Sequence, residues 1–410
     1  MEKKIIKNTV ILSFANLLAR AVGFFYFIFL GRILGVEIFG HYNFALALVY
    51  NFYPVADFGI ERLILRDLSK DQSKAQIYFQ KLIPLRLYFS AASIIIVTAW
   101  GLLIGKTALD KTNVFVFSLC LIPWTFNQLV AGIGNAFEKM EVQSVVAFGA
   151  TFFTVVIGGT IARFGGSVTQ ILLAALFSNL IVSVIALRFS RKIGLRFKID
   201  KDFGFIKKML KESWIFALIM IMAVFYLRTS VILVNYFKGA YYTGLYSSAF
   251  KFIEASILIP QSFALALFPQ TARLLKDNKK SLGINYIKSL ELILIFALGY
   301  AVFFYFFAPL IIKLSYGNSY LEAVTVLRIL GFAAIFFFLN TLPGNIIQNS
   351  LKVKKFLIFA FLNLVLVFIF GITLIPKYSI VGAAIAVLLA EVAGFVINNA
   401  FVWKILNEKS

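Results

Sequence analysis

The sequence predicts an all-α integral membrane protein with about twelve transmembrane helices, arranged as two parallel-repeat six-helix bundles around a central cavity. Three observations predict this class. Of the 410 residues, 61% are hydrophobic and 14% are charged, whereas soluble domains carry roughly a quarter charged residues. Apolar runs of bilayer-spanning length recur along the whole chain. Similar short motifs also occur at matching places in the two halves.

Length and hydropathy define the expected spans. The first apolar run, 8–30, follows a short charged start and is as long as a bilayer is thick. It is therefore interpreted as a transmembrane helix rather than a cleavable signal peptide. The other spans are expected at 40–60, 82–104, 112–134, 142–163, 166–188, 213–235, 244–268, 289–312, 324–347, 355–375 and 380–403.

Lysine and arginine indicate the orientation of these spans. With a cytoplasmic N-terminus, 28 of the 40 lysines and arginines fall in cytoplasmic segments and 7 in outside loops. Cytoplasmic loops of membrane proteins carry such an excess. An even number of spans then predicts that both termini are cytoplasmic.

An internal repeat predicts the domain organisation. Phe39-Gly40-His41-Tyr42 opens one span, and Thr243-Gly244-Leu245-Tyr246 opens its counterpart in the second half. Pro54 and Pro260 also occupy matching places. Two equally oriented units would be related by an axis along the membrane normal, and transporters built in this way bind substrate between their halves. The expected domains are an N-terminal six-helix lobe, a basic cytoplasmic linker and a C-terminal six-helix lobe, at 1–190, 191–212 and 213–410.

Cations inside the spans are the candidate substrate-binding residues. An arginine at the centre of a span costs at least ~2.5 kcal/mol to insert, so such a residue is a functional candidate. Arg20 lies near the centre of 8–30, with Asn16 one helical turn earlier on the same face. Arg228 and Lys251 lie in two spans of the second half. The pattern predicts a polar, mostly cationic cavity that binds substrate through these four residues.

Three carboxylates inside the spans, Asp57, Glu254 and Glu391, are candidates for binding a coupling ion. Alternatives remain open for each. Lys251 and Glu254 are three residues apart and could neutralise each other as a structural pair. Asp57 could merely face the membrane interface, and Glu391 has no obvious partner on its own helix.

Four further residues have a favoured structural interpretation. Arg86 and Arg328 lie near span ends, where arginine can extend to the headgroups, and a substrate role is the second interpretation. His41 is interpreted as an interfacial polar residue, because one histidine cannot build a histidine metal site. Cys120 is the single cysteine, which excludes an internal disulfide and a cysteine metal cluster.

The sequence lacks several signatures of enzymes. It contains no glycine-rich phosphate loop and no HExxH or CxxC motif, and its predicted outside loops are short. We therefore expect no catalytic residue, no metal and no cofactor. The net charge of +22 is interpreted as basic loops at an anionic membrane surface rather than as a nucleic-acid-binding surface.

Several motifs resemble those of a known family. Phe29-Leu-Gly-Arg-Ile-Leu-Gly-Val-Glu-Ile-Phe-Gly-His-Tyr42 and Asp57-Phe-Gly-Ile-Glu-Arg-Leu-Ile-Leu-Arg66 are similar to the start of Wzx-type polysaccharide flippases. Gly134-Asn-Ala-Phe-Glu-Lys139 and Gly382-Ala-Ala-Ile-Ala386 fit the same family. The likeness covers nearly the whole chain, and its motifs are diffuse. This family belongs to the multidrug/oligosaccharidyl-lipid/polysaccharide (MOP) exporter superfamily.

The resemblance implies a function for the cationic cavity. It implies transport of undecaprenyl-diphosphate-linked oligosaccharide from the cytoplasmic to the outer leaflet of a prokaryotic plasma (inner) membrane, coupled to a proton or sodium ion. Partners would be the lipid-linked substrate, the bilayer and polysaccharide assembly proteins. Three rivals stay open: a multidrug–cation antiporter of the same superfamily, a membrane glycosyltransferase or polymerase, and a structural membrane protein without transport. An excess of buried cations disfavours the first, and short outside loops disfavour the second.

Overall fold

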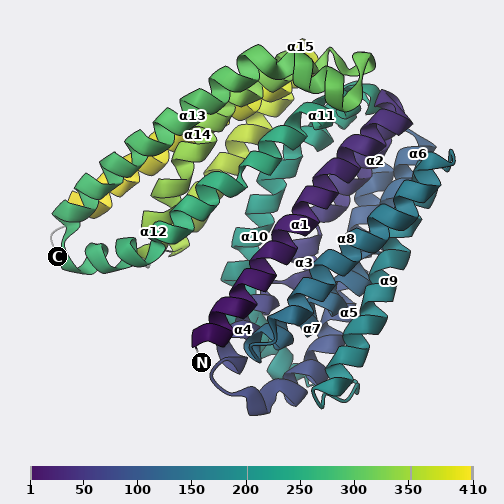
Figure 1. The fold of residues 1–410 in the computed structure, drawn as a ribbon, viewed down its shortest axis with the longest axis vertical. Coiled ribbons are helices and arrows are strands. Elements are labelled where there is room, and N and C mark those ends of the chain that lie inside the picture. Colours follow the sequence, from purple (N-terminus) through teal and green to yellow (C-terminus); the bar gives the residue numbers. More distant parts are fainter. Residues whose placement is uncertain (1, 201, 351–352, 408–410) are drawn as a thin grey trace. The chain divides into compact units, whose positions relative to one another are not determined.

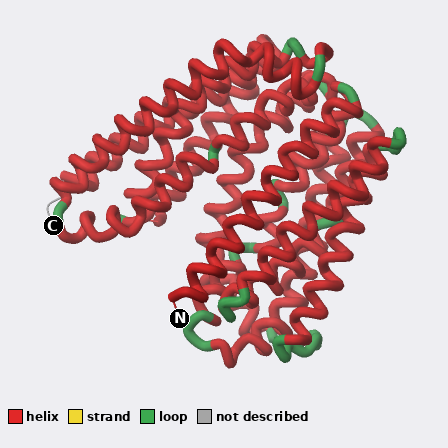
Figure 2. Tube along the Cα trace, viewed as in Figure 1, coloured by secondary structure: helices red, strands yellow, loops and turns green. Residues whose placement is uncertain are grey.

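The protein is helical throughout the part that its computed structural model describes. That part comprises residues 2–200, 202–350 and 353–407, with side chains from Ala15 onward apart from residues 276 and 353–356. No strand occurs within these ranges (Figures 1 and 2). Ten helical stretches of the described chain are long and apolar enough to cross a membrane. The predicted class, an all-α multi-pass membrane protein, is confirmed.

The chain forms two compact units. Unit 1 comprises Met1–Leu34 and His41–Val224, and unit 2 comprises Gly35–Gly40 and Phe225–Ser410. Two helices therefore belong to both units: α2 (Val36–Tyr50) and α10 (Phe203–Lys238). Unit 1 also contains α1 (Glu2–Leu34), α3 (Tyr53–Asp57), α4 (Ile60–Leu68), η1 (Gln72–Lys74), α5 (Ala75–Ile104), α6 (Ala108–Ser118), α7 (Leu121–Ala136), α8 (Met140–Arg163) and α9 (Val168–Lys192). Unit 2 also contains α11 (Ala240–Ser256), α12 (Leu258–Asp277), α13 (Lys279–Tyr316), η2 (Asn318–Tyr320), α14 (Ala323–Asn349) and α15 (Val353–Asn407).

The ten stretches and the roughly twelve predicted spans differ because some helices break and others join. The predicted span 40–60 consists of α2, α3 and the start of α4, none of which is long enough alone. Phe58 (φ 51°) and Gly59 (φ 70°), both left-handed, separate α3 from α4. The predicted spans 355–375 and 380–403 are joined in α15, which is kinked where Ser379 leaves helical geometry. Pro54 is the second residue of α3, so this proline lies in the first turn of a new helix after a break in the span.

The boundary between the two units does not coincide with the predicted linker, 191–212. The units divide within α10, between Val224 and Phe225, so residues 191–212 belong to unit 1. Arg196 exchanges two backbone hydrogen bonds with the Gln76 amide, at 2.8 and 3.0 Å. Lys81 Nζ lies 2.6 Å from Asp202 Oδ2, and this hydrogen bond lowers the pKa of Asp202. The segment is therefore held against α5, and its assignment as a linker between two transport lobes stays a prediction.

Unit 2 contains one unusually close helix crossing. A Cβ atom on Gly40 would lie 1.8 Å from the carbonyl oxygen of Ala240, and one on Gly244 would lie 2.0 Å from the carbonyl oxygen of Val36. Only glycine permits backbones to approach this closely, as at the small-residue crossings of membrane helices. Gly40 and Gly244 are matching positions of the predicted repeat, so equivalent residues of α2 and α11 meet here.

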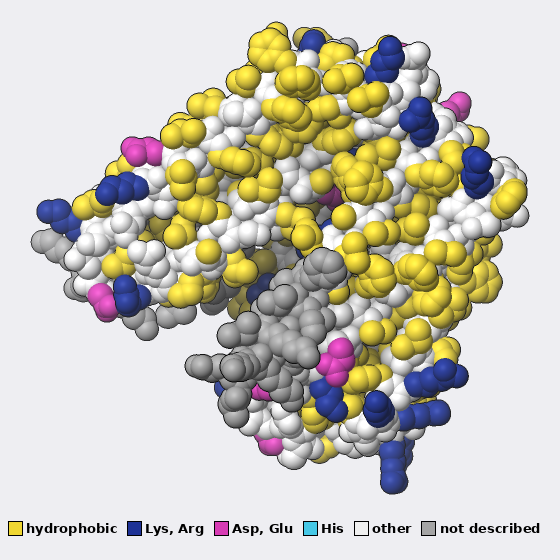
Figure 3. Space-filling model, in the orientation of Figure 1, with side chains coloured by type: hydrophobic (Ala, Val, Ile, Leu, Met, Phe, Trp, Pro, Cys, Tyr) yellow, Lys and Arg dark blue, Asp and Glu magenta, His cyan; other side chains and the backbone are white. Residues whose placement is uncertain are grey.

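The surface composition agrees with a bilayer environment. Hydrophobic side chains are spread over the face in Figure 3, and lysines and arginines are seen mainly toward its edges. Phe25 and Leu103 are 68% and 83% exposed, as expected of side chains that contact lipid rather than water.

Candidate functional site

Three of the predicted site residues, Arg228, Lys251 and Glu254, lie together in unit 2 and are called the cation triad here, after its two cations. Glu254 of α11 accepts a hydrogen bond from Arg228 Nη2 of α10 through Oε1, and it pairs with Lys251 Nζ at 2.9 Å through Oε2. The three side chains are 22–23% exposed, so the cluster is neither sealed in the core nor free in solvent. The Lys251–Glu254 pair, which the sequence left open, is confirmed.

The two cations of this triad outnumber its single carboxylate. One carboxylate faces two permanent cations, so the group carries a net charge of +1 when all three are ionised. Its partial exposure allows another anion to approach. An arginine presents several N–H donors in a planar fork, which suits binding of a phosphate oxygen beside an existing carboxylate contact.

Glu391 lies in a different environment within unit 2. Its carboxylate accepts hydrogen bonds from the Tyr226 hydroxyl of α10 and, at 2.7 Å, from Asn340 Nδ2 of α14. Asn398, two turns further along α15, donates to Asn340 Oδ1 at 3.2 Å. Glu391 is 5% exposed, and the side chains that donate hydrogen bonds to its carboxylate, Tyr226 and Asn340, are neutral. The Glu391 network (Tyr226, Asn340, Glu391 and Asn398) is thus a buried carboxyl held by neutral donors.

Asp57 is paired inside unit 1. Arg86 Nη2 donates to Asp57 Oδ1 at 2.7 Å, and Arg86 Nη1 donates to the carbonyl oxygen of Thr125 at 2.6 Å. The Asp57 and Arg86 side chains are 0% and 2% exposed. The interpretation that Arg86 extends to the headgroups is wrong, and so is an interfacial Asp57. Each provides the other's compensating charge within the helix bundle, a contact 29 residues apart that sequence spacing does not show.

The backbone break after Asp57 fixes the position of its side chain. Asp57 ends α3, and α4 starts three residues later. At Gly59 a Cβ atom would lie 2.7 Å from the backbone nitrogen of Ala217 in α10. The left-handed glycine therefore permits close packing of the break against α10 and holds Asp57 toward α5.

Arg20 and Asn16 lie on α1 of unit 1. The Arg20 side chain is exposed and Asn16 is half-buried. Among the side chains that the structure describes, no hydrogen bond or ion pair to Arg20 is present. The structure thus brings Arg228, Lys251 and Glu254 together, whereas Asp57, Glu391 and Arg20 lie in separate surroundings.

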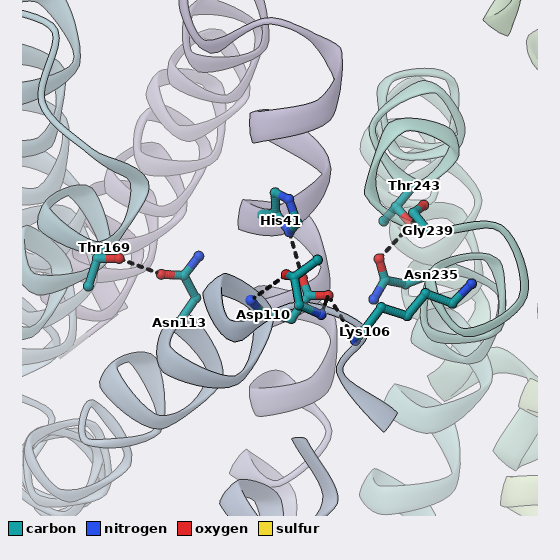
Figure 4. Close-up of polar contacts among 9 residues, drawn as sticks. His41, Lys106, Asp110, Asn113, Thr169, Asn235, Gly239 and Thr243 are labelled. Carbon is teal, nitrogen blue, oxygen red and sulfur yellow. Dashed lines mark hydrogen bonds and ion pairs between the residues drawn. The ribbon is translucent and has the colours of Figure 1, made fainter. Parts of the chain in front are cut away.

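His41 has a partner that the sequence analysis did not identify (Figure 4). Its Nδ1 lies 2.7 Å from Asp110 Oδ1, and both residues are buried. His41 is therefore paired within unit 1, and its predicted position at the membrane interface stays a prediction. The same view shows a neutral pair in unit 1, in which the Thr169 hydroxyl donates to Asn113 Oδ1 at 2.7 Å. It also shows a contact within unit 2 between the Thr243 hydroxyl and Asn235 Oδ1 at 3.2 Å.

Sequence reasoning did not identify Arg86 as the partner of Asp57. It also missed the other polar residues of these clusters: Asp110, Tyr226, Asn340 and Asn398. Asp110 carries one local signal, because Thr107 and Asp110 have the spacing of a capping box. The others are single polar residues within apolar helices. The general rule that such residues face the bundle interior could have identified them as candidates. It could not have shown which residue contacts which.

The comparison with known families decides the classification. The model of the family described as "Polysaccharide biosynthesis protein" matches residues 5–275, well over half of the chain. The chain belongs to this family. Capsular polysaccharide biosynthesis protein CapF of Staphylococcus aureus is 22% identical, with 94% of this chain and 96% of that protein covered. A putative O-antigen transporter of Shigella flexneri is 24% identical, with 93% and 94% covered.

Solved structures show that this family member has the fold of MOP transporters. A structure of the lipid II flippase MurJ, in an inward closed conformation, superimposes with a TM-score of 0.76 at 15% identity over 97% of this chain and 89% of that chain. An inward-facing multidrug resistance MATE family transporter superimposes with a TM-score of 0.74 at 15% identity over 98% and 99%. At such identities the likeness establishes the fold alone.

Proposed function

We propose that this protein is a flippase that moves undecaprenyl-diphosphate-linked oligosaccharide from the cytoplasmic to the outer leaflet of a prokaryotic plasma membrane by alternating access. The observation that carries the proposal is the partly exposed cation triad of unit 2, in which two cations share one carboxylate within membrane-spanning helices. A diphosphate is the part of such a substrate that needs cationic partners at this depth. The capsular and O-antigen relatives support the same substrate class.

Arg20 is the candidate cation of unit 1, with Asn16 as an adjacent hydrogen-bonding group. An exposed arginine on an apolar helix, without a described protein partner, is available to an anionic ligand. We propose that Arg20, Arg228 and Lys251 bind the diphosphate, with Asn16 contributing a neutral contact. The glycan would lie in water and the polyprenyl chain in lipid.

Glu391 is the best of the three candidates for the coupling ion. Asp57 faces Arg86, and Glu254 faces two cations, so each carboxylate already has positive charge beside it. Glu391 has neutral oxygen and nitrogen partners, which can hold either a protonated carboxyl or a carboxylate with sodium. We propose Glu391 as the site of proton or sodium coupling.

Reconstitution tests the proposed function. Vesicles containing the protein and a polyprenyl-diphosphate-linked oligosaccharide would be assayed with an impermeant lectin for transfer of the glycan between leaflets. We expect transfer driven by a proton or sodium gradient, and we expect Glu391→Gln to abolish the gradient dependence while the protein still folds. Gradient-driven export of a fluorescent organic cation, with no glycan transfer, would instead establish the multidrug–cation antiporter.

A further inference from the structure

A groove of about 260 Å³ lies between α12, α13 and α14 of unit 2. We propose that it binds the phosphate-bearing headgroup of an anionic phospholipid from the cytoplasmic leaflet. None of the residues that line it belongs to the cation triad or to the Glu391 network. The proposed lipid site therefore does not depend on the proposed flippase function.

The lining of the groove changes from polar to apolar with depth. Four polar lining residues fall in 269–288, a segment predicted to lie on the cytoplasmic side: Gln270, Thr271, Asn285 and Lys288. Three lining leucines fall inside the predicted spans 244–268, 289–312 and 324–347: Leu267, Leu292 and Leu342. A phospholipid has the same order, because its phosphate lies at the membrane surface and its acyl chains lie in the hydrocarbon.

The turn between α12 and α13 sets the height of these residues. This turn, at Asn278, lies at one end of unit 2, and both helices lead away from it (Figure 1). Residues equally far from the turn along the two helices lie at about the same height, because each residue adds the same rise. Thr271 and Asn285 are each seven residues from Asn278, so they form one polar level. Leu274 and Leu282 line the groove nearer the turn.

Hydrogen bonds between helices hold the walls of the groove. Asn345 of α14 donates through Nδ2 to the carbonyl oxygen of Ala264 in α12, and its Oδ1 accepts from Asn349 Nδ2 at 2.8 Å. The Tyr286 hydroxyl of α13 donates to Asn399 Oδ1 of α15. Asn345 and Tyr286 both line the groove, so these two side chains fix its walls.

The other polar side chains of the groove have no hydrogen bond or ion pair to any side chain or backbone group that the structure describes: Gln270, Thr271, Asn285, Lys288 and Ser289. Thr271 is 8% exposed, and a hydroxyl buried to this degree without a partner costs free energy. Asn285 and Ser289 are four residues apart on α13 and share one face of it. The groove thus offers one positive charge and several neutral donors that the described protein leaves unused.

These groups suit a phosphodiester. Its oxygens accept hydrogen bonds from an ammonium, an amide and a hydroxyl, and Lys288 would balance its negative charge. Pockets that enclose drug-sized ligands measure about 300–1,000 Å³, so a groove of about 260 Å³ suits a headgroup rather than an oligosaccharide. Anionic lipids are concentrated in the cytoplasmic leaflet, and basic pockets between transmembrane helices on that side bind their headgroups.

Photocrosslinking tests where the lipid binds. The full chain in lipid nanodiscs would be irradiated with phosphatidylglycerol that carries a photoreactive group beside the phosphate, and adducts would be mapped by mass spectrometry. We expect adducts in 267–274 and 285–292. Lys288→Gln should reduce them about five-fold, because one basic residue near the surface is lost.

Lys280→Gln is the matched control for this experiment. Lys280 is an exposed lysine of the same helix that does not line the groove, so its replacement should leave the adducts unchanged. Adducts found only elsewhere in the chain would overturn the site. Equal labelling of the Lys288 and Lys280 variants would overturn it as well.

Competition identifies the occupant. Unlabelled phosphatidylglycerol should displace the photoreactive lipid, whereas phosphatidylcholine with the same acyl chains and inorganic phosphate should not. Equal displacement by phosphatidylcholine would refute the preference for an anionic lipid. Displacement by inorganic phosphate would indicate a site for free phosphate. Displacement by a polyprenyl diphosphate but not by phosphatidylglycerol would indicate a second substrate site, and either result refutes the phospholipid proposal.

Thr271→Val separates lipid binding from folding. The change removes the unpaired hydroxyl, so in phosphatidylcholine nanodiscs the variant should unfold at the same temperature as the unaltered protein or a higher one. Phosphatidylglycerol should raise the unfolding temperature of the unaltered protein, because it binds the folded state, and should raise that of Thr271→Val less. An equal rise in both proteins would refute the role of Thr271. Vesicles that bind phosphatidylglycerol at this site but transfer no glycan would refute the flippase function and leave the lipid site standing.

Discussion

Single ionisable residues in the membrane helices differ in what balances their charge. Asp57 has one arginine beside it, Glu254 has two cations, and Glu391 has neutral donors. These partners distinguish a carboxylate held in a structural ion pair from one that is a candidate for binding an ion. Residue type and depth in the membrane do not make this distinction.

Arg228 should contribute to substrate binding through its charge. Arg228→Gln leaves Glu254 paired with Lys251 alone and removes the excess cation of the triad, so glycan transfer should fall strongly. The loss corresponds to about 2–5 kcal/mol of binding if a phosphate is left unpaired. Arg228→Lys should retain part of the transport. The half-buried Arg328, which donates to the carbonyl oxygen of Tyr305, provides the matched control as Arg328→Gln. Equal transport by both Gln variants would contradict the role of the triad.

The Asp57–Arg86 pair should act mainly on stability. Asp57→Asn leaves the buried Arg86 without its counter-charge and should destabilise the protein by about 3–5 kcal/mol, measured by thermal unfolding in detergent. The double variant Asp57→Asn/Arg86→Gln should lose less than the sum of the two single changes. Strictly additive losses would show that the two charges do not depend on each other.

At the scale of helices, the informative feature is where elements break or approach closely. The left-handed break at Phe58 and Gly59 positions Asp57, and the kink at Ser379 divides α15. The α2–α11 crossing brings two backbones closer than any side chain permits. Such places constrain a bundle whose helices must move during transport.

Adding a methyl group at the crossing should separate α2 from α11. Gly40→Ala or Gly244→Ala places a Cβ where a carbonyl oxygen lies, so we expect a loss of about 1–3 kcal/mol in stability together with reduced transport. Gly299→Ala is the matched control, because nothing lies within 4 Å of a Cβ at that position of α13. Thermal unfolding and glycan transfer would be measured for all three. Full transport by Gly40→Ala would show that the close approach is dispensable.

For the whole molecule, the distribution of positive charge makes a prediction about orientation. Segment 189–212 carries Lys198 and is expected in the cytoplasm, whereas Lys111 is expected outside. In a Cys120→Ser background, single cysteines at these two positions would be treated with an impermeant thiol reagent on intact cells. Only the cysteine at position 111 should react. Labelling at position 198 would reverse the orientation and with it the proposed direction of transport.

The sequence by itself determined the membrane class, most of the helices and the residues that merit attention. Hydropathy and length do this because a bilayer requires long apolar helices and penalises every buried charge. The Lys251–Glu254 pair was also within reach, since residues three apart share a helix face. Tertiary structure alone decided which distant charges meet: Arg86 with Asp57, Asp110 with His41, and Tyr226 and Asn340 with Glu391. The physical reason is that hydropathy records the cost of burying a polar group, whereas the partner that offsets this cost is set by helix packing between segments far apart in the chain.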